Sequence, residues 1–118
     1  MFFILSCKDE TTDVRFTLKS DSGITFKYDL SAESDLNILN YLYYNNGAGV
    51  ATGDFDNDGL IDIYFTSNQG SDKLYHNQSN LTFKDITAQA GISNDTGWTT
   101  GVTTVDINND GLLDIYIS

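Results

Sequence analysis

Proline is absent from this 118-residue chain, and cysteine and histidine occur once each, as Cys7 and His76. A single cysteine excludes a disulfide within the chain and any cluster of cysteine ligands around a metal. A single histidine argues against zinc, which proteins usually bind through several histidines and cysteines. Metals that prefer thiolate ligands are therefore excluded.

Basic residues are also scarce, because 6 Lys and Arg stand against 17 Asp and Glu, for a net charge of −11. Nucleic-acid binding depends on Lys and Arg that neutralise phosphates, so we expect no nucleic-acid partner, RNA included. The same balance argues against an anionic membrane surface. No apolar run approaches the roughly 18 residues of a membrane span, while 40% hydrophobic residues suffice for a folded core.

The N-terminal segment has a short apolar run that ends in the single cysteine. Ile4-Leu5-Ser6-Cys7 resembles a lipobox, in which the cysteine becomes the lipidated first residue of a bacterial lipoprotein. Lys8-Asp9-Glu10 resembles the charged tag that sends some lipoproteins to the outer face of the outer membrane. We interpret residues 1–10 as the remnant of a lipoprotein signal and a charged tether, with a natural start upstream. Membrane contact would then occur only through a lipid anchor at Cys7; the alternative is a buried strand with a structural cysteine.

An internal repeat dominates the rest of the chain. Residues 49–66 recur as residues 101–118, at an offset of 52, with 11 of the 18 positions identical. Such self-similarity marks each unit as one supersecondary building block. A weaker echo matches the segment around Gly23 to the segment around Gly91, and it predicts that Val14–Tyr28 forms the outer strand of a blade. In a full ring this strand would close the last blade, and in this chain we expect it to be unpaired or paired to the wrong edge.

The repeat predicts short strands joined by tight turns. Apolar residues alternate with polar ones from 61 to 66, which is the period of a strand. Together with strands near 49–55, 74–76 and 81–86, this gives four antiparallel strands per unit, the pattern of a β-propeller blade. We therefore predict an all-β fold that forms about two blades of an incomplete ring. The predicted parts are an outer strand and connector (11–48), a first repeat (49–100) and the start of a second repeat (101–118). Within the first part, Ser31–Tyr44 is the one segment whose apolar spacing instead favours a helix.

Two loops rich in aspartate follow the first strand of each repeat. Side-chain oxygens at positions 1, 3, 5 and 9 converge when the chain wraps around one point, and glycine at position 6 permits the sharp turn. Multiple oxygen ligands from a flexible loop are typical of calcium, whereas magnesium demands stricter geometry. We therefore expect two Ca²⁺ sites. Their ligands would be Asp54, Asp56, Asp58, Leu60 and Asp62 in the first loop, and Asp106, Asn108, Asp110, Leu112 and Asp114 in the second.

These loops differ from an EF-hand. The leucines at position 7 would bind through their backbone carbonyls, and position 12 is an apolar strand residue, Phe65 or Ile117, where an EF-hand has a bidentate Glu. The alternative interpretation is a run of solvated aspartates in turns. Four carboxylates within nine residues would repel one another without a cation, however, which favours metal binding.

The repeat resembles a known family. Gly47–Gly59, Leu74-Tyr75-His76-Asn77 and Phe83–Gly91 are similar to the FG-GAP, or VCBS, repeats of the integrin alpha-chain propeller. They are more closely similar to the proteins related to cartilage acidic protein, which carry an ASPIC/UnbV domain after the propeller. The resemblance covers about residues 14–118 and implies a calcium-stabilised β-propeller. His76 stands where that family more often has Arg.

No residue is a candidate for catalysis. His76 has no Ser or Cys nucleophile in a recognisable motif around it, so we interpret it as a strand-end or inter-blade contact, and Trp98 as blade packing. We therefore expect a non-enzymatic, calcium-binding module of a cell-surface lipoprotein, which binds an extracellular protein or glycan. The alternative is the propeller scaffold of an extracellular enzyme, for example one that acts on polysaccharide.

Overall fold

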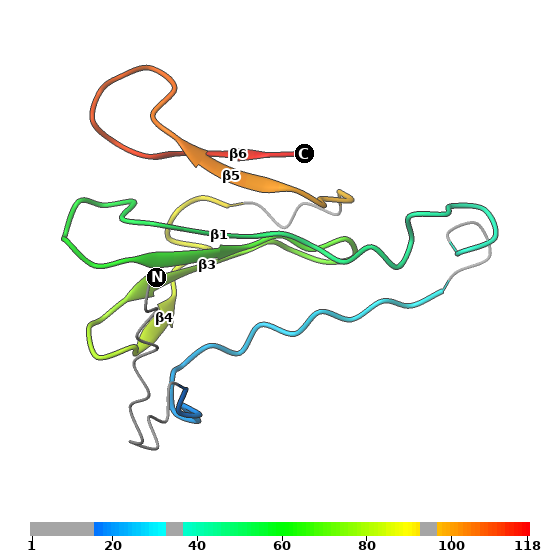
Figure 1. Ribbon diagram of the computed structural model, residues 1–118, viewed down its shortest axis with the longest axis horizontal. Coiled ribbons are helices and arrows are strands. Elements are labelled where there is room, and N and C mark those ends of the chain that lie inside the picture. Colours follow the sequence, from blue (N-terminus) through cyan, green and yellow to red (C-terminus); the bar gives the residue numbers. More distant parts are fainter. Residues whose placement is uncertain (1–15, 33–36, 93–96) are drawn as a thin grey trace, which may run out of the picture.

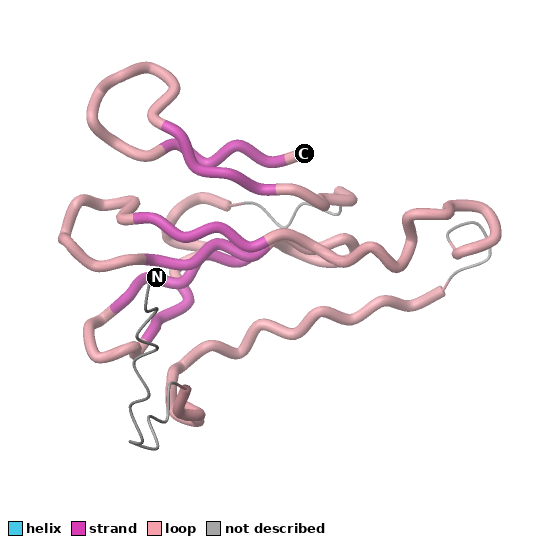
Figure 2. Tube along the Cα trace, in the orientation of Figure 1, coloured by secondary structure: helices cyan, strands magenta, loops and turns pink. Residues whose placement is uncertain are grey.

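The computed structural model describes residues 16–32, 37–92 and 97–118, and within these ranges the chain forms six β-strands and no helix (Figures 1 and 2). No described segment is therefore a helix with the length and apolarity to cross a membrane. Cys7 and the predicted signal remnant lie outside the described residues.

The first repeat forms a four-stranded antiparallel sheet in which each strand pairs with the next along the chain. Its strands are β1 (Val50–Gly53), β2 (Asp62–Phe65), β3 (Lys73–Asn77) and β4 (Phe83–Asp85). The register sets Ala51 opposite Tyr64 and Tyr64 opposite Leu74, and all three side chains are buried on the same face of the sheet. This meander confirms the predicted four-stranded blade.

The second repeat forms an antiparallel hairpin of β5 (Val102–Val105) and β6 (Asp114–Ile117). The hairpin lies beside the first sheet, with β5 next to β1 (Figure 1). The close approach depends on Gly53, because a Cβ atom there would lie 2.9 Å from Cδ1 of Leu113. The buried face of the first sheet is therefore the face on which the second repeat packs.

An extended segment, residues 22–31, lies across the opposite face of the first sheet. Its first residue meets β4, where the Phe83 backbone N–H donates to the Ser22 carbonyl at 2.7 Å. Further along, the ring of Phe26 stacks on that of Phe65 in β2, with centroids 4.7 Å apart. Its residues alternate between half-buried and exposed, as in a strand, yet no ladder of backbone hydrogen bonds forms in this described segment.

The outer strand over Val14–Tyr28 stays a prediction, because it pairs the segment with the last blade of a full ring; in its described part, residues 16–28, the chain forms no helix and belongs to neither sheet. The alternating apolar side chains favour an extended chain, but burying them on the sheet face directs the segment across the strands rather than along the edge of β4. The remainder of the predicted strand lies outside the described residues.

The predicted helix at Ser31–Tyr44 is wrong for its described part, which forms successive turns. The side-chain carbonyl of Asn37 accepts the backbone N–H groups of Leu39 and Asn40, at 2.9 and 3.3 Å, and such local bonds compete with a helix. Two tyrosines of this region, Tyr41 and Tyr44, pack against Trp98, with ring centroids 5.6 and 5.7 Å away. Trp98 thus has the packing role that the sequence indicated.

Candidate metal site

The first acidic loop, residues 54–62, joins β1 to β2 and wraps around the carboxylate of Asp54. One oxygen of Asp54 accepts the backbone N–H of Asp58 at 3.0 Å, and the other accepts that of Gly59 at 2.9 Å. Two residues have the left-handed backbone that the wrap requires: Asn57, with φ 58°, and Gly59, with φ 86°. The glycine at position 6 is thus needed for its conformation, as the sequence predicted.

The aspartates at positions 3 and 5 each use one oxygen to hold the loop. Asp56 Oδ1 accepts the N–H of Asp58 at 3.3 Å, and Asp58 Oδ1 accepts the N–H of Leu60 at 2.8 Å. These two hydrogen bonds are exposed to solvent, and neither uses the Oδ2 atom of Asp56 or Asp58. The loop therefore presents further carboxylate oxygens for a ligand.

Asp62 closes the loop from inside the sheet, where it is only 2% exposed. Its carboxylate accepts the N–H of Phe55 at 3.3 Å and the N–H of Asn77 at 2.8 Å. The side-chain amide of Asn77 in turn donates to the Ile61 carbonyl at 2.9 Å. Asn77 thereby joins the loop to β3, a role that the sequence analysis missed because the contact spans 15 residues.

The second acidic loop, residues 106–114, has the same hydrogen-bond pattern between β5 and β6. Asp106 accepts the N–H groups of Asp110 and Gly111, at 3.0 and 2.9 Å, and Asp114 accepts that of Ile107 at 3.0 Å. The two left-handed positions also recur, with φ 60° at Asn109 and 87° at Gly111. The repeat in sequence is therefore a repeat in loop conformation.

The loops differ at position 3. In the second loop, the amide of Asn108 donates to Asp110 Oδ2 at 2.8 Å, so these two side chains bond to each other. A hydrogen bond from the Leu112 backbone N–H, followed by the bond from Asn108, lowers the pKa of the Asp110 carboxyl below its ordinary value. In the first loop, position 3 is a carboxylate and no such bond can form.

His76 lies against the first acidic loop, from its place on β3. Its Nδ1 atom is 3.2 Å from Asp62 Oδ1 and 3.4 Å from Asp56 Oδ2, and its Nε2 atom is 3.8 Å from Asp58 Oδ2. The imidazole thus joins a group of three potential ligands, with Asp56 and Asp58, whose donor atoms all lie within 4.8 Å of one another. The sequence alone predicts a strand-end or inter-blade contact for His76 and does not connect it with the loop.

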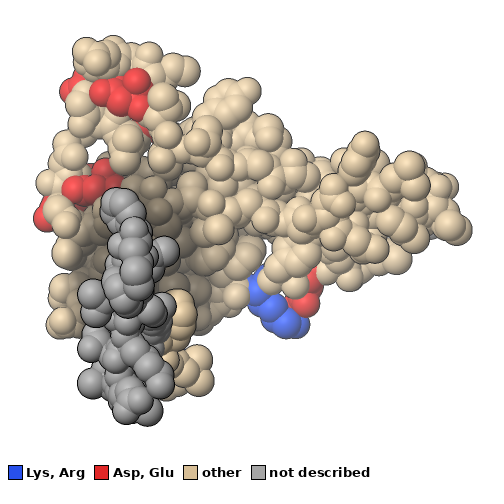
Figure 3. Space-filling model, in the orientation of Figure 1, with Lys and Arg blue, Asp and Glu red and all other residues tan. Residues whose placement is uncertain are grey.

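The acidic side chains gather at the ends of the two hairpins, on the left of the molecule in Figure 3. Of the predicted side-chain ligands, the structure brings donor atoms of Asp56 and Asp58 together, beside His76. Asp54 and Asp62 lie at the start and end of the same loop, and their carboxylates accept backbone N–H groups. The predicted carbonyl ligands, those of Leu60 and Leu112, belong to the two loops, and their role stays a prediction. Each loop offers oxygen donors, which suits a hard cation such as calcium.

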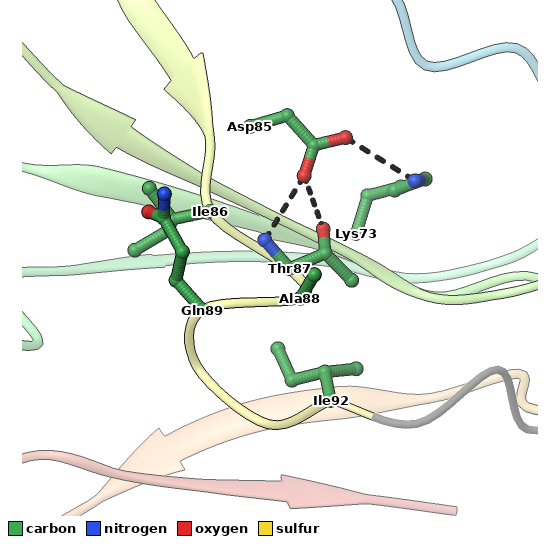
Figure 4. A pocket seen from close by; sticks show the side chains of 7 residues that line it. All are labelled: Lys73, Asp85, Ile86, Thr87, Ala88, Gln89 and Ile92. Carbon is green, nitrogen blue, oxygen red and sulfur yellow. Dashed lines mark hydrogen bonds and ion pairs between the residues drawn. The ribbon is translucent and has the colours of Figure 1, made fainter.

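Away from the loops, an open pocket of about 290 Å³ lies at the end of β4 (Figure 4). Its polar groups bond to one another: Asp85 accepts from the backbone and hydroxyl of Thr87 and from the Lys73 ammonium, the last at 3.2 Å. The Thr87 hydroxyl, and after it the Thr87 N–H and Lys73, lower the pKa of Asp85. These contacts indicate a structural network rather than a binding site. The lining residues are Lys73, Asp85, Ile86, Thr87, Ala88, Gln89 and Ile92.

Comparison with known proteins gives a consistent result. Residues 54–117 match the FG-GAP-like repeat family. Over 93 residues, which is 79% of this chain, the sequence is 34% identical to mouse cartilage acidic protein 1 and 32% identical to the human and Xenopus tropicalis proteins of that name. The matched region spans only 13 to 14% of the length of these relatives. No solved structure matches the chain.

Proposed function

The chain belongs to the FG-GAP-like repeat family, and we propose that it is a calcium-binding β-propeller module that serves in binding rather than in catalysis. The observation that carries the proposal is the shared conformation of the two acidic loops. The first residue of each loop, Asp54 or Asp106, accepts the backbone N–H groups of the fifth and sixth residues of its own loop. The residues with left-handed backbone also occupy equivalent positions in the two loops. A run of solvated aspartates in surface turns would not be expected to repeat this conformation around a carboxylate in both loops.

The residues present fit calcium. Both loops supply carboxylate and carbonyl oxygens, and the second adds the amide oxygen of Asn108. A divalent cation would offset the repulsion among the clustered carboxylates. A bound ion would also fix the turn between two strands of a blade, so we assign it a structural role. The proposed ligands are Asp54, Asp56, Asp58, Asp62 and the Leu60 carbonyl, and Asp106, Asn108, Asp110, Asp114 and the Leu112 carbonyl.

An extracellular setting suits such sites. Calcium sites of extracellular modules often have dissociation constants of about 10⁻⁴–10⁻³ M, and the matched relatives are named for cartilage. We propose that Cys7 carries a lipid anchor and that the module is displayed on the cell surface. We further propose that it binds an extracellular protein or glycan, because the net charge of −11 opposes nucleic acid.

A stability measurement tests the calcium proposal. Thermal unfolding of the chain is followed by circular dichroism in EGTA and in millimolar Ca²⁺, for the wild type and for an Asp54→Ala/Asp106→Ala double variant. We expect Ca²⁺ to raise the Tm of the wild type and to leave the double variant unchanged, since binding to the folded state alone is stabilising. Asp29→Ala, at an exposed position outside the loops, is the matched control and should respond like the wild type. An equal Tm in EGTA and Ca²⁺ for the wild type would overturn the proposal.

A further inference from the structure

We propose that the first acidic loop, together with His76, also forms a site for a divalent transition metal such as Zn²⁺, with Asp56, Asp58 and the imidazole as ligands. The inference rests on the proposed function only in that the same two carboxylates serve both ions.

The spacing of the donor atoms fits a small cation. Ligand atoms about 2.0–2.2 Å from a tetrahedral zinc lie roughly 3.3–3.6 Å from one another. One imidazole binds a given ion through a single nitrogen, and His76 Nδ1 lies 3.4 Å from Asp56 Oδ2. One donor atom each from Asp56, Asp58 and His76 lies within 4.8 Å of the others. A side-chain movement of about 1 Å would therefore bring the three donors to the spacing of a zinc site, with no movement of β3 relative to the loop.

The donor atoms are also available. The Oδ1 atoms of Asp56 and Asp58 hold backbone N–H groups of the loop, whereas their Oδ2 atoms are the ones nearest His76. His76 Nδ1 is buried and has no hydrogen-bond partner, although it lies 3.2 Å from Asp62 Oδ1, because that contact lacks hydrogen-bond geometry. A metal ion would supply the missing partner.

The imidazole distinguishes this group from a calcium loop. Imidazole nitrogen is a preferred ligand of zinc, copper, nickel and iron, whereas calcium selects oxygen. With a 24% exposed side chain, His76 is deep enough to be held in place and open enough for an ion to enter. The sequence argued against zinc because it has one histidine, but the fold supplements that histidine with two carboxylates.

The second acidic loop has no equivalent group within the described residues. His76 is the single histidine of the chain, and the Asp110 oxygen that corresponds to Asp58 Oδ2 is bonded to the Asn108 amide at 2.8 Å. This loop is therefore an internal control that shares the calcium ligands but lacks the nitrogen.

The single histidine makes the test direct, because the ¹H–¹³C spectrum contains one set of imidazole signals. The experiment uses the full chain with Cys7→Ser, which removes the one thiol, and titrates Zn²⁺ by NMR and by calorimetry. We expect the imidazole signals to shift with one equivalent of Zn²⁺. His76→Asn should weaken this binding at least about tenfold, because losing even a group that only supports a metal ligand costs about 10–100-fold. Asp29→Asn, at an exposed position outside both loops, should leave the binding unchanged.

The outcomes separate this inference from the proposed function. Zn²⁺ affinity that is equal in the wild type and His76→Asn, or imidazole signals that do not move, would overturn the inference even if Ca²⁺ binds. Such a result would mean that His76 only forms ion pairs with the loop. If Zn²⁺ shifts the imidazole but Ca²⁺ neither binds nor stabilises the same sample, the inference holds and the calcium proposal fails.

Discussion

Tyr64 and Tyr116 occupy the same position in the two copies of the repeat, yet Tyr64 is 4% exposed and Tyr116 is 61% exposed. The difference arises from what lies beside each strand. Next to Tyr64, β3 completes the sheet, and the turn before it places Asp72 Oδ2 2.9 Å from the Tyr64 hydroxyl. No described strand pairs with β6 on its far side. The same local sequence thus has the same backbone but a different burial.

Removing the hydroxyl of Tyr64 and that of Tyr116 should have unequal effects on the free energy of unfolding. Tyr64→Phe should lower the free energy of unfolding by about 1–3 kcal/mol, because Asp72 is buried and loses a hydrogen-bond donor. Tyr116→Phe is the matched control and should change stability by less than about 0.5 kcal/mol. Urea unfolding measures both. Equal effects of the two substitutions would mean that the bond to Asp72 contributes nothing to stability.

The blade and both loops were predictable from the sequence, because their signals are local. Strand alternation has a period of two residues, and glycine at position 6 of each loop marks a left-handed turn, which Gly59 and Gly111 adopt. The repeat doubled these signals, so the antiparallel meander and the loop boundaries followed from spacing alone.

The contacts that were missed are non-local. The echo around Gly23 predicted a strand, and residues 22–31 are extended, but a local sequence match cannot tell an edge strand from a segment that lies across a sheet. Likewise, nothing near His76 in the sequence points to the first acidic loop. It faces the loop because antiparallel pairing of β2 and β3 places His76 beside Asp62. Such pairings depend on the register of the fold rather than on any motif.

The network at Asp85 predicts a pH dependence of stability. Hydrogen bonds from Thr87, with a smaller effect of Lys73, hold the folded-state pKa of Asp85 below its ordinary value of 3.8. A lowered folded pKa means that the ionised group stabilises the fold above the unfolded pKa, and that this stability is lost as pH falls through the folded pKa. Asp85→Asn should therefore be less stable than the wild type at pH 6, and the difference should shrink below about pH 4.

Chemical denaturation at several pH values between 2.5 and 7 measures this difference. Asp29→Asn is the control, since Asp29 pairs with Lys27 at an exposed position and has side-chain exposure of 67%. Its effect should be small at every pH. A difference between wild type and Asp85→Asn that stays constant down to pH 2.5 would contradict the lowered pKa.

Residues 22–31 should detach when their aromatic contact is removed. Phe26→Ala deletes the ring that stacks on Phe65, and because Phe26 is half-buried we expect a loss of about 1–2 kcal/mol, less than for a fully buried Phe. Cleavage by trypsin after Lys27 should become faster, since the detached segment fits a protease more readily. Phe16→Ala is the matched control, because Phe16 is 91% exposed. If both variants are cleaved at the wild-type rate, the stacking does not hold the segment.

The two loops should bind Ca²⁺ with unequal affinity, the first more tightly. The first offers four carboxylates, whereas the second offers three and has the neutral Asn108 at position 3. Calcium affinity depends on ligand charge and on the rigidity of the site. The first loop is favoured on both counts, because the hydrogen bond from the Asn77 backbone to Asp62 ties it to β3.

Exchanging the residues at position 3 tests this inequality by calorimetric Ca²⁺ titration. Asp56→Asn should weaken the tighter step, because it removes one negative charge but keeps an oxygen ligand. Asn108→Asp should strengthen the weaker step, although it also breaks the bond to Asp110 and places two carboxylates side by side. That repulsion raises the free energy of the empty loop, and it is relieved when the ion binds, so stability and affinity should change in opposite directions. Lower stability in EGTA together with tighter binding is therefore the expected signature of Asn108→Asp. An unchanged tighter step in Asp56→Asn would mean that ligand charge does not set the order of the two sites.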